Sequence, residues 1–117
     1  MRNFGTVAHE FFHSWNIERI RPRSLEPFDF TRANMSGELW LGEGFTNYYE
    51  ALTMRRAGFT TDAEFAEGLG GAVDAIINAP GRRFFSAVDM SRQAPFVDAA
   101  ASIDAQNKAN NSPDNSK

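Results

Sequence analysis

Apolar residues recur at helical spacing in the first part of the chain and predict a helix from about Phe4 to Ile17, with Asn3 as its N-cap. The apolar positions lie three or four residues apart and form one broad stripe, which consists of Phe4, Val7, Ala8, Phe11, Phe12 and Trp15. His9 and His13 fall on the opposite, polar side of this helix. We therefore expect the stripe to pack inward and the two histidines to face away from the core.

A loop and a second helix follow the first helix. Residues 18–30 contain two prolines and show no period, so they predict an ordered loop. The second helix is predicted from residue 37 or 38 to residue 56, with Ser36 as its N-cap. Its expected buried stripe consists of Leu41, Phe45, Tyr48 and Leu52. On the opposite side, the same spacing places three polar residues, Glu43, Asn47 and Glu50.

A third helix is predicted from a capping box. Gly58 is expected to end the second helix, and the sequence Thr61-Asp62-Ala63-Glu64 pairs a cap residue with a glutamate three positions later. The helix should extend to about Asn78, where Pro80-Gly81 stops it. Its predicted core face consists of Phe65, Leu69, Ala72, Val73, Ile76 and Ile77.

The last part of the chain carries weaker patterns. It allows a short helix from about Ser86 to Arg92, and Ala94-Pro95 is expected to break any longer one. Residues 104–117 contain no large hydrophobic side chain, so they predict a disordered polar tail. The predicted fold is all-α, with three main helices and ordered loops in a single helical unit, residues 1–103.

Composition narrows the classes of protein. The chain has 117 residues, enough for one domain. Its net charge of -3 gives no general attraction to nucleic acid or to an anionic membrane, and we expect neither as a partner. It has no cysteine, which excludes disulfides and thiolate metal sites. No apolar run reaches transmembrane length and the N-terminus does not match a signal peptide, so the compartment stays open.

A short basic cluster, Arg19, Arg21 and Arg23, lies in the predicted loop. Such arginines can clamp a phosphate or a carboxylate. They can also pair with their acidic neighbours, which are Glu18, Glu26 and Asp29. We favour the second interpretation, because the neighbours and the whole chain are acidic.

The motif with the most specific chemistry is H-E-x-x-H, formed by His9, Glu10 and His13. Its two histidines are the only ones in the chain. Residues four apart lie one turn apart on a helix, so both imidazoles can reach one metal ion, as a tetrahedral zinc site requires. In zinc peptidases with this motif the glutamate is the general base. The alternative is that two surface histidines happen to lie one turn apart.

Two histidines do not complete a zinc site, and without cysteine the remaining protein ligand must be a carboxylate, or else water takes its place. Glu43, within the sequence L-W-L-G-E-G-F-T, is the strongest candidate. The alternative is a solvated glutamate on a helix face. The flanking residues Gly42 and Gly44 either let the backbone or the metal site approach closely or are simply tolerated.

Three separated blocks resemble the glycyl aminopeptidase family of gluzincin metallopeptidases: H-E-F-F-H-x-W-N-x-x-R-I-R-P, P-F-D-F-T-R and L-W-L-G-E-G-F-T-N-Y-Y. The resemblance covers about residues 4–104. It implies the helical part of a thermolysin-like catalytic domain, with one zinc ion bound by His9, His13 and Glu43. It also implies that Glu10 acts as general base on a zinc-activated water, and that the substrates are peptides with N-terminal glycine or alanine.

The resemblance also suggests a residue that supports the ligands. By analogy with gluzincins, Asn47 is expected to hydrogen-bond the outer nitrogen of His9, and Glu50 is the alternative partner. Family members also have an N-terminal β-rich region and a later block with a catalytic tyrosine, and this sequence matches neither. Tyr48 and Tyr49 are expected to serve packing.

These departures lead us to expect a catalytic-domain fragment whose partners are the missing N-terminal and C-terminal regions of a parent enzyme. Alone, it should bind zinc and show little or no peptidase activity. Two other functions remain as alternatives: a non-catalytic helical interaction module, and nucleic-acid binding through the arginine cluster.

Overall fold

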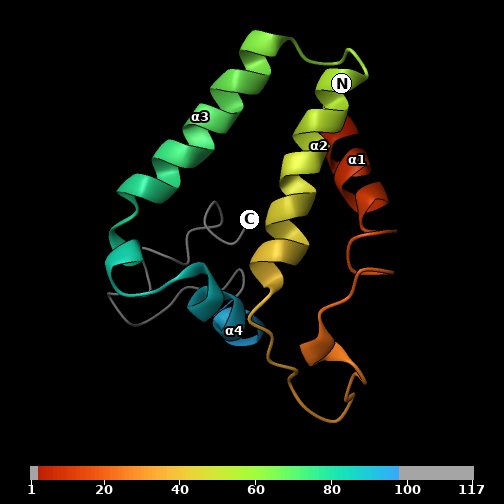
Figure 1. The fold of residues 1–117 in the computed structure, drawn as a ribbon, viewed down its shortest axis with the longest axis vertical. Coiled ribbons are helices and arrows are strands. Elements are labelled where there is room, and N and C mark those ends of the chain that lie inside the picture. The colour runs from red at the N-terminus through yellow and green to blue at the C-terminus, as the bar shows by residue number, and fades with distance from the viewer. Residues whose placement is uncertain (1–2, 98–117) are drawn as a thin grey trace.

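Four α-helices make up most of residues 3–97, the part of the chain that this computed structural model describes (Figure 1). They are α1 (Phe4–Phe12), α2 (Phe45–Arg56), α3 (Asp62–Asn78) and α4 (Ala87–Val97). No strand is present in this part, which confirms the predicted all-α class. The predicted disordered tail, residues 104–117, lies outside the described residues. Among residues 3–97, no helix combines the length and apolar character needed to cross a membrane.

The first helix ends at Phe12, five residues earlier than predicted. Beyond it the chain tightens into a turn that buries Asn16, and Ile17 adopts a left-handed backbone with φ of 96°. The peptide N–H of Ile17 then donates to the carbonyl of Ile20 at 3.1 Å. A β-branched residue rarely takes this conformation, so contacts distant in sequence must hold the turn in place.

The second helix begins with a π-helical turn, Trp40–Gly44, which continues directly into α2. The helical turn starts two or three residues later than predicted, and its N-cap is Leu39 rather than Ser36, so that prediction is wrong. Ser36 instead accepts a hydrogen bond from the backbone N–H of Glu38 at 3.1 Å, just ahead of the turn. A π-turn contains one residue more than an α-helical turn between the same hydrogen bonds, and it often occurs at functional sites.

Helices α1 and α2 lie side by side (Figure 1), and they meet through the histidine side of α1 and through Phe12, which stacks on Tyr49 with the ring centroids 4.8 Å apart. Val7 and Phe11 of the predicted α1 stripe are 62% and 66% exposed, and Phe45 and Tyr48 of the predicted α2 stripe are also exposed. The expectation that these stripes are buried is therefore wrong, and no hydrophobic residue among those described is fully buried. The contacts between polar side chains decide which faces meet.

Helix α3 has its predicted bounds and its predicted capping box. The backbone N–H of Glu64 donates to Thr61 Oγ1 at 3.2 Å, and the N–H of Thr61 donates to the Glu64 carboxylate at 2.7 Å. Gly58, with φ of 79°, follows the end of α2 as predicted. From this connection α3 diverges from α2 (Figure 1), and the C-terminal part of its predicted core face, Val73, Ile76 and Ile77, is exposed.

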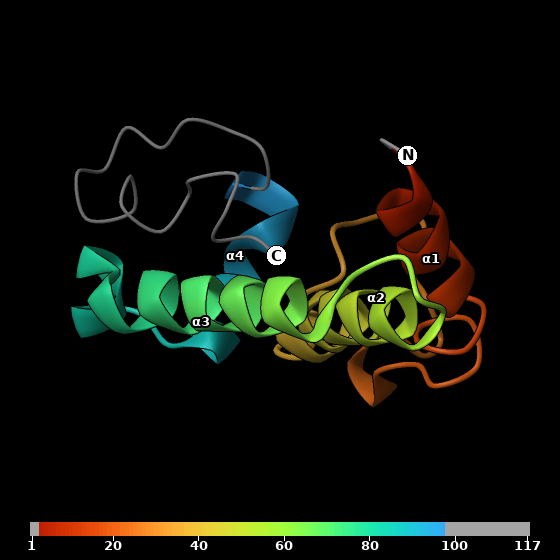
Figure 2. The same cartoon turned by 90° about the horizontal axis from the view of Figure 1, so that it is seen from above.

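Helix α4 continues through Pro95 to Val97, so the predicted break at Ala94-Pro95 is wrong. Pro95 lies in the last turn, where its missing N–H removes only one helical hydrogen bond. Figure 2 shows α2 and α3 in one layer with α1 and α4 on the same side of it. The buried hydroxyl of Ser91 accepts from the N–H of Trp40 at 3.0 Å and fixes α4 to the start of the π-turn.

The segment between α1 and the π-turn is the predicted ordered loop, with a single 3-10 turn at Arg23–Leu25. In the arginine cluster, Arg21 pairs with Glu26 at 2.7 Å, and Arg19 donates to the backbone carbonyl of Ser14. These contacts agree with the interpretation that the arginines hold the loop.

Candidate metal centre

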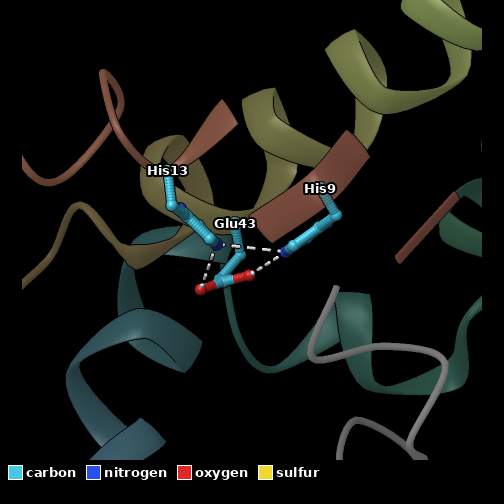
Figure 3. Close-up of side chains that lie close together, drawn as sticks. All are labelled: His9, His13 and Glu43. Atoms are coloured by element: carbon cyan, nitrogen blue, oxygen red, sulfur yellow. Dashed lines mark hydrogen bonds and ion pairs between the residues drawn. The ribbon is translucent and has the colours of Figure 1, made fainter. Parts of the chain in front are cut away.

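Three side chains from α1 and the π-turn converge on one point (Figure 3). The Nε2 atoms of His9 and His13 are 3.1 Å apart. One carboxylate oxygen of Glu43 lies 3.2 Å from His9 Nε2, and the other lies 3.6 Å from His13 Nε2. All three side chains are half-buried. These are the three metal ligands that the resemblance implies, and the structure brings them together.

The spacing of these atoms suits a small tetrahedral cation. Zinc bonds of about 2.0–2.1 Å at tetrahedral angles separate neighbouring ligand atoms by roughly 3.3 Å. The two Nε2 atoms, 3.1 Å apart, and His9 Nε2 with the nearer Glu43 oxygen, 3.2 Å apart, are close to that value, and one ligand atom from each of the three residues lies within 4.8 Å of the other two. The two imidazole rings are nearly perpendicular, with an interplanar angle of 80°, so each directs one nitrogen inward. The donor set of two imidazoles and one carboxylate also leaves a fourth position open, as catalytic zinc sites do.

The outer ring nitrogens fix which nitrogen can bind a metal. His9 Nδ1 lies 3.3 Å from the Glu50 carboxylate, and His13 Nδ1 lies 3.1 Å from the backbone carbonyl of Asn16. Carboxylate and carbonyl oxygens only accept hydrogen bonds, so these partners favour the tautomers with the proton on Nδ1. In a neutral ring of that tautomer the Nε2 atom carries a lone pair that can bind a metal ion. The arrangement of the two Nε2 atoms and the Glu43 carboxylate therefore suits a metal ion.

Local structure explains how the ligands reach one another. His9 lies in the last turn of α1, and His13 is its C-cap, so the partial negative charge of the helix end adds to the attraction for a cation. Glu43 lies within the π-turn rather than in regular α-helix. The polar faces of α1 and α2 must meet for this contact to form, which accounts for the exposure of their apolar stripes.

The supporting partner of His9 is Glu50, the alternative to Asn47. Positions seven apart on a helix differ by about 20° around its axis, so Glu50 faces α1 from nearly the same direction as Glu43, two turns further along. Asn47 is half-buried between them and makes no hydrogen bond to His9 in the described part of the chain. The longer side chain of Glu50 reaches the imidazole of His9, and the shorter side chain of Asn47 does not.

Glu10, the predicted general base, follows His9 on α1 and is exposed to solvent. Its carboxylate makes no hydrogen bond or ion pair with any other residue between positions 3 and 97. A carboxylate next to the ligand cluster and open to water is accessible for proton transfer, although no contact in the structure assigns it that role.

Two glycines let the ligand-bearing segments approach closely. A Cβ on Gly42 would lie 2.8 Å from the Cδ1 atom of Ile17, and a Cβ on Gly5 would lie 2.5 Å from a carboxylate oxygen of Glu50. Gly44 has open space at the corresponding position. Of the two interpretations of the flanking glycines, close approach applies to Gly42 and simple tolerance to Gly44.

One residue of the site was not found by sequence reasoning. Asn16 is 6% exposed, contacts His13 through its backbone and contacts the π-turn through its side chain. A buried asparagine three residues after the second histidine gives little signal by itself, because its partners lie 25 to 30 positions away in the sequence. The predicted helical continuation to Ile17 also concealed the turn that it occupies.

Comparison with known proteins gives one match. The model of the M61 glycyl aminopeptidase family matches residues 2–117, which is nearly the whole chain. Comparisons with curated proteins and with solved structures found no match.

Proposed function

Because the chain belongs to the M61 glycyl aminopeptidase family, a family of peptidases, we propose that it is the zinc-binding catalytic unit of a metallo-aminopeptidase. The observation that carries this proposal is the convergence of His9 Nε2, His13 Nε2 and the Glu43 carboxylate within 3.1–3.6 Å. A neutral imidazole whose outer nitrogen donates a hydrogen bond has an unprotonated inner nitrogen, and this is the form that can bind a metal ion.

The residues take distinct roles in this proposal. His9, His13 and Glu43 hold one zinc ion, which when bound polarises a carbonyl and makes water more acidic. Glu10, exposed beside the ligands, removes the proton from the attacking water and delivers it to the departing amine. Glu50 holds the tautomer of His9 that leaves Nε2 unprotonated.

The proposed substrates are short peptides with glycine or alanine at the N-terminus. The family description, glycyl aminopeptidase, supports glycine at the N-terminus, and alanine is carried over from the resemblance of the sequence. We expect slow turnover by this chain, because its two tyrosines serve aromatic packing: Tyr49 stacks on Phe12 at 4.8 Å, and Tyr48 lies edge-on to Tyr49. No residue between positions 3 and 97 is therefore assigned to stabilise the charge that develops on the carbonyl oxygen, and such a donor is worth about a hundredfold in rate or more.

Zinc content tests the proposal directly. The purified chain should hold one zinc ion after dialysis, while His13→Ala and Glu43→Ala should lose it. Glu10→Gln is the matched control, since Glu10 contacts no ligand and its loss should leave zinc bound while removing any hydrolysis of glycyl and alanyl peptides. Stoichiometric zinc in both ligand variants would overturn the assignment. A wild-type chain without zinc, with helicity unaffected by chelators, would favour the interaction-module alternative.

A further inference from the structure

We propose that Asn16 is a positioning residue that fixes the two ligand-bearing segments relative to each other, an inference that rests on the proposed zinc site. Its backbone carbonyl accepts a hydrogen bond from His13 Nδ1 at 3.1 Å. Its side-chain amide contacts the segment that carries Glu43. One residue therefore holds one ligand directly and the backbone next to another.

The amide of Asn16 contacts two carbonyl oxygens of the π-turn and one hydroxyl oxygen in the first turn of α2. Its Nδ2 atom lies 3.0 Å from the carbonyl oxygens of Leu41 and Gly42 and 3.1 Å from Thr46 Oγ1. Leu41 and Gly42 come directly before Glu43, and Thr46 comes three residues after it. The contacts therefore enclose the position of Glu43 along the helix from both sides.

A π-turn needs such a partner. Its backbone bonding differs from that of an α-helix, and side chains can take over carbonyls at the transition between the two. The carbonyl of Gly42 receives both the amide of Asn16 and, at 2.6 Å, the hydroxyl of Thr46. Asn16 is 6% exposed and Thr46 is fully buried, so water cannot easily replace either bond.

The surrounding backbone pays a conformational cost that makes this contact possible. Ile17, the next residue, has φ of 96°, a conformation that is unfavourable for a β-branched residue. Its Cδ1 atom lies only 2.8 Å from the position that a Cβ on Gly42 would take. The strained turn and the missing side chain together allow Asn16 to lie directly over the π-turn.

Substitution of the side chain separates this role from general stability. Asn16→Ala removes the amide and keeps the backbone carbonyl that faces His13. Asn34→Ala is the matched control, because Asn34 is a half-buried asparagine whose amide also donates to two backbone carbonyls, those of Asp29 at 2.7 Å and Arg32 at 3.0 Å. The control removes a loop anchor of the same kind whose hydrogen bonds go to Asp29 and Arg32 and to none of the proposed ligands.

The readouts are zinc affinity, measured by competition with a chromogenic chelator, and the visible spectrum of the cobalt-substituted chain. Asn16→Ala should bind zinc about 10- to 100-fold more weakly, the range found when groups that orient metal ligands are removed. Its cobalt bands should weaken and shift, because the geometry around the metal changes. Asn34→Ala should reproduce the wild-type affinity and spectrum, even if it lowers the melting temperature.

If Asn16→Ala does not fold, Thr46→Val provides the second test, since it removes one hydroxyl of the same network while keeping the volume. A smaller loss of affinity in the same direction is expected. Wild-type affinity and an unchanged cobalt spectrum in a folded variant would overturn the positioning role alone. Failure of the wild-type chain to bind zinc would instead overturn the proposed function.

Discussion

The pairing of α1 with α2 and the course of α3 show two different ways in which an amphipathic helix is held. Helices α1 and α2 meet through histidines, carboxylates and the stack of Phe12 on Tyr49, and they leave much of their apolar stripes exposed. Helix α3 begins at a complete capping box and then diverges with Val73, Ile76 and Ile77 exposed. The first arrangement depends on contacts distant in sequence, and the second depends on local bonds. The two regions should therefore respond differently to the same change.

Removal of the proposed zinc ion should have the largest effect, and it should fall on α1 and α2. A ligand present at a hundred times its dissociation constant stabilises the folded state by about 2.7 kcal/mol, which corresponds to roughly 10–20 °C in melting temperature for a domain of this size. Hydrogen exchange with and without EDTA should show faster exchange in α1 and the π-turn. Equally accelerated hydrogen exchange in α3, or unchanged exchange in both regions, would contradict the view that the two regions are held by different kinds of contact.

Adding a single methyl group at the close approach should have the next largest effect. Gly42→Ala places a Cβ 2.8 Å from Ile17 Cδ1, and such overpacking costs about 1–3 kcal/mol. Gly44→Ala is the control two positions away, where the new methyl meets open space and alanine favours the helix by up to about 1 kcal/mol. Urea unfolding of both variants measures the difference. Equal stabilities would mean that the turn at Asn16 does not pack on the π-turn.

Substitution on the apolar side of α3 should have a small effect. Val73 is 56% exposed, so Val73→Ser should change the free energy of unfolding by no more than about 0.5 kcal/mol. Phe12→Ala should lower the free energy of unfolding several times more, because Phe12 of α1 stacks on Tyr49 of α2. A loss of about 2 kcal/mol or more at Val73 would show that something covers this side of α3 in solution.

Acid should have the smallest and most local effect. The backbone N–H and hydroxyl of Thr61 lower the pKa of Glu64 from its ordinary value of 4.5. A carboxyl group whose pKa is lower in the folded state favours folding above its ordinary value, and that contribution is lost as the pH falls through the lower value. The first turn of α3 should therefore fray as the pH falls through this lowered pKa.

Amide chemical shifts between pH 7 and 3 would report this fraying. Glu64→Gln should remove the pH dependence of the first turn. Glu67→Gln, on the same helix and without a side-chain partner in the described part of the chain, should retain it. An identical pH response in both variants would show that the capping box does not cause the fraying.

Local chemistry made much of this molecule predictable. The capping box at Thr61 places the start of α3, and Gly58 marks the end of α2, because both act through bonds to near neighbours. The spacing of His9 and His13, together with one glutamate candidate, was enough to indicate three residues that the structure brings together.

Features that depend on distant contacts could not be predicted. The end of α1 is set by Asn16, which reaches across to Leu41 and Gly42. The π-turn has no sequence signal of its own beyond the glycine that tolerates close approach. Periodicity showed that α1 and α2 are amphipathic, and it could not show that attraction between polar groups would bring their hydrophilic sides together.

The π-turn also fixes how the residues before it are rotated about the helix axis relative to α2. Deleting one residue within Trp40–Gly44 would restore an uninterrupted α-helix and turn everything before the deletion by about 100° about the common axis relative to everything after it. The Trp40 N–H bound by Ser91 and the Glu50 carboxylate bound to His9 lie on opposite sides of that junction. Because the π-turn contains one extra residue, Trp40 can bind Ser91 of α4 while Glu50 of the same helix faces His9.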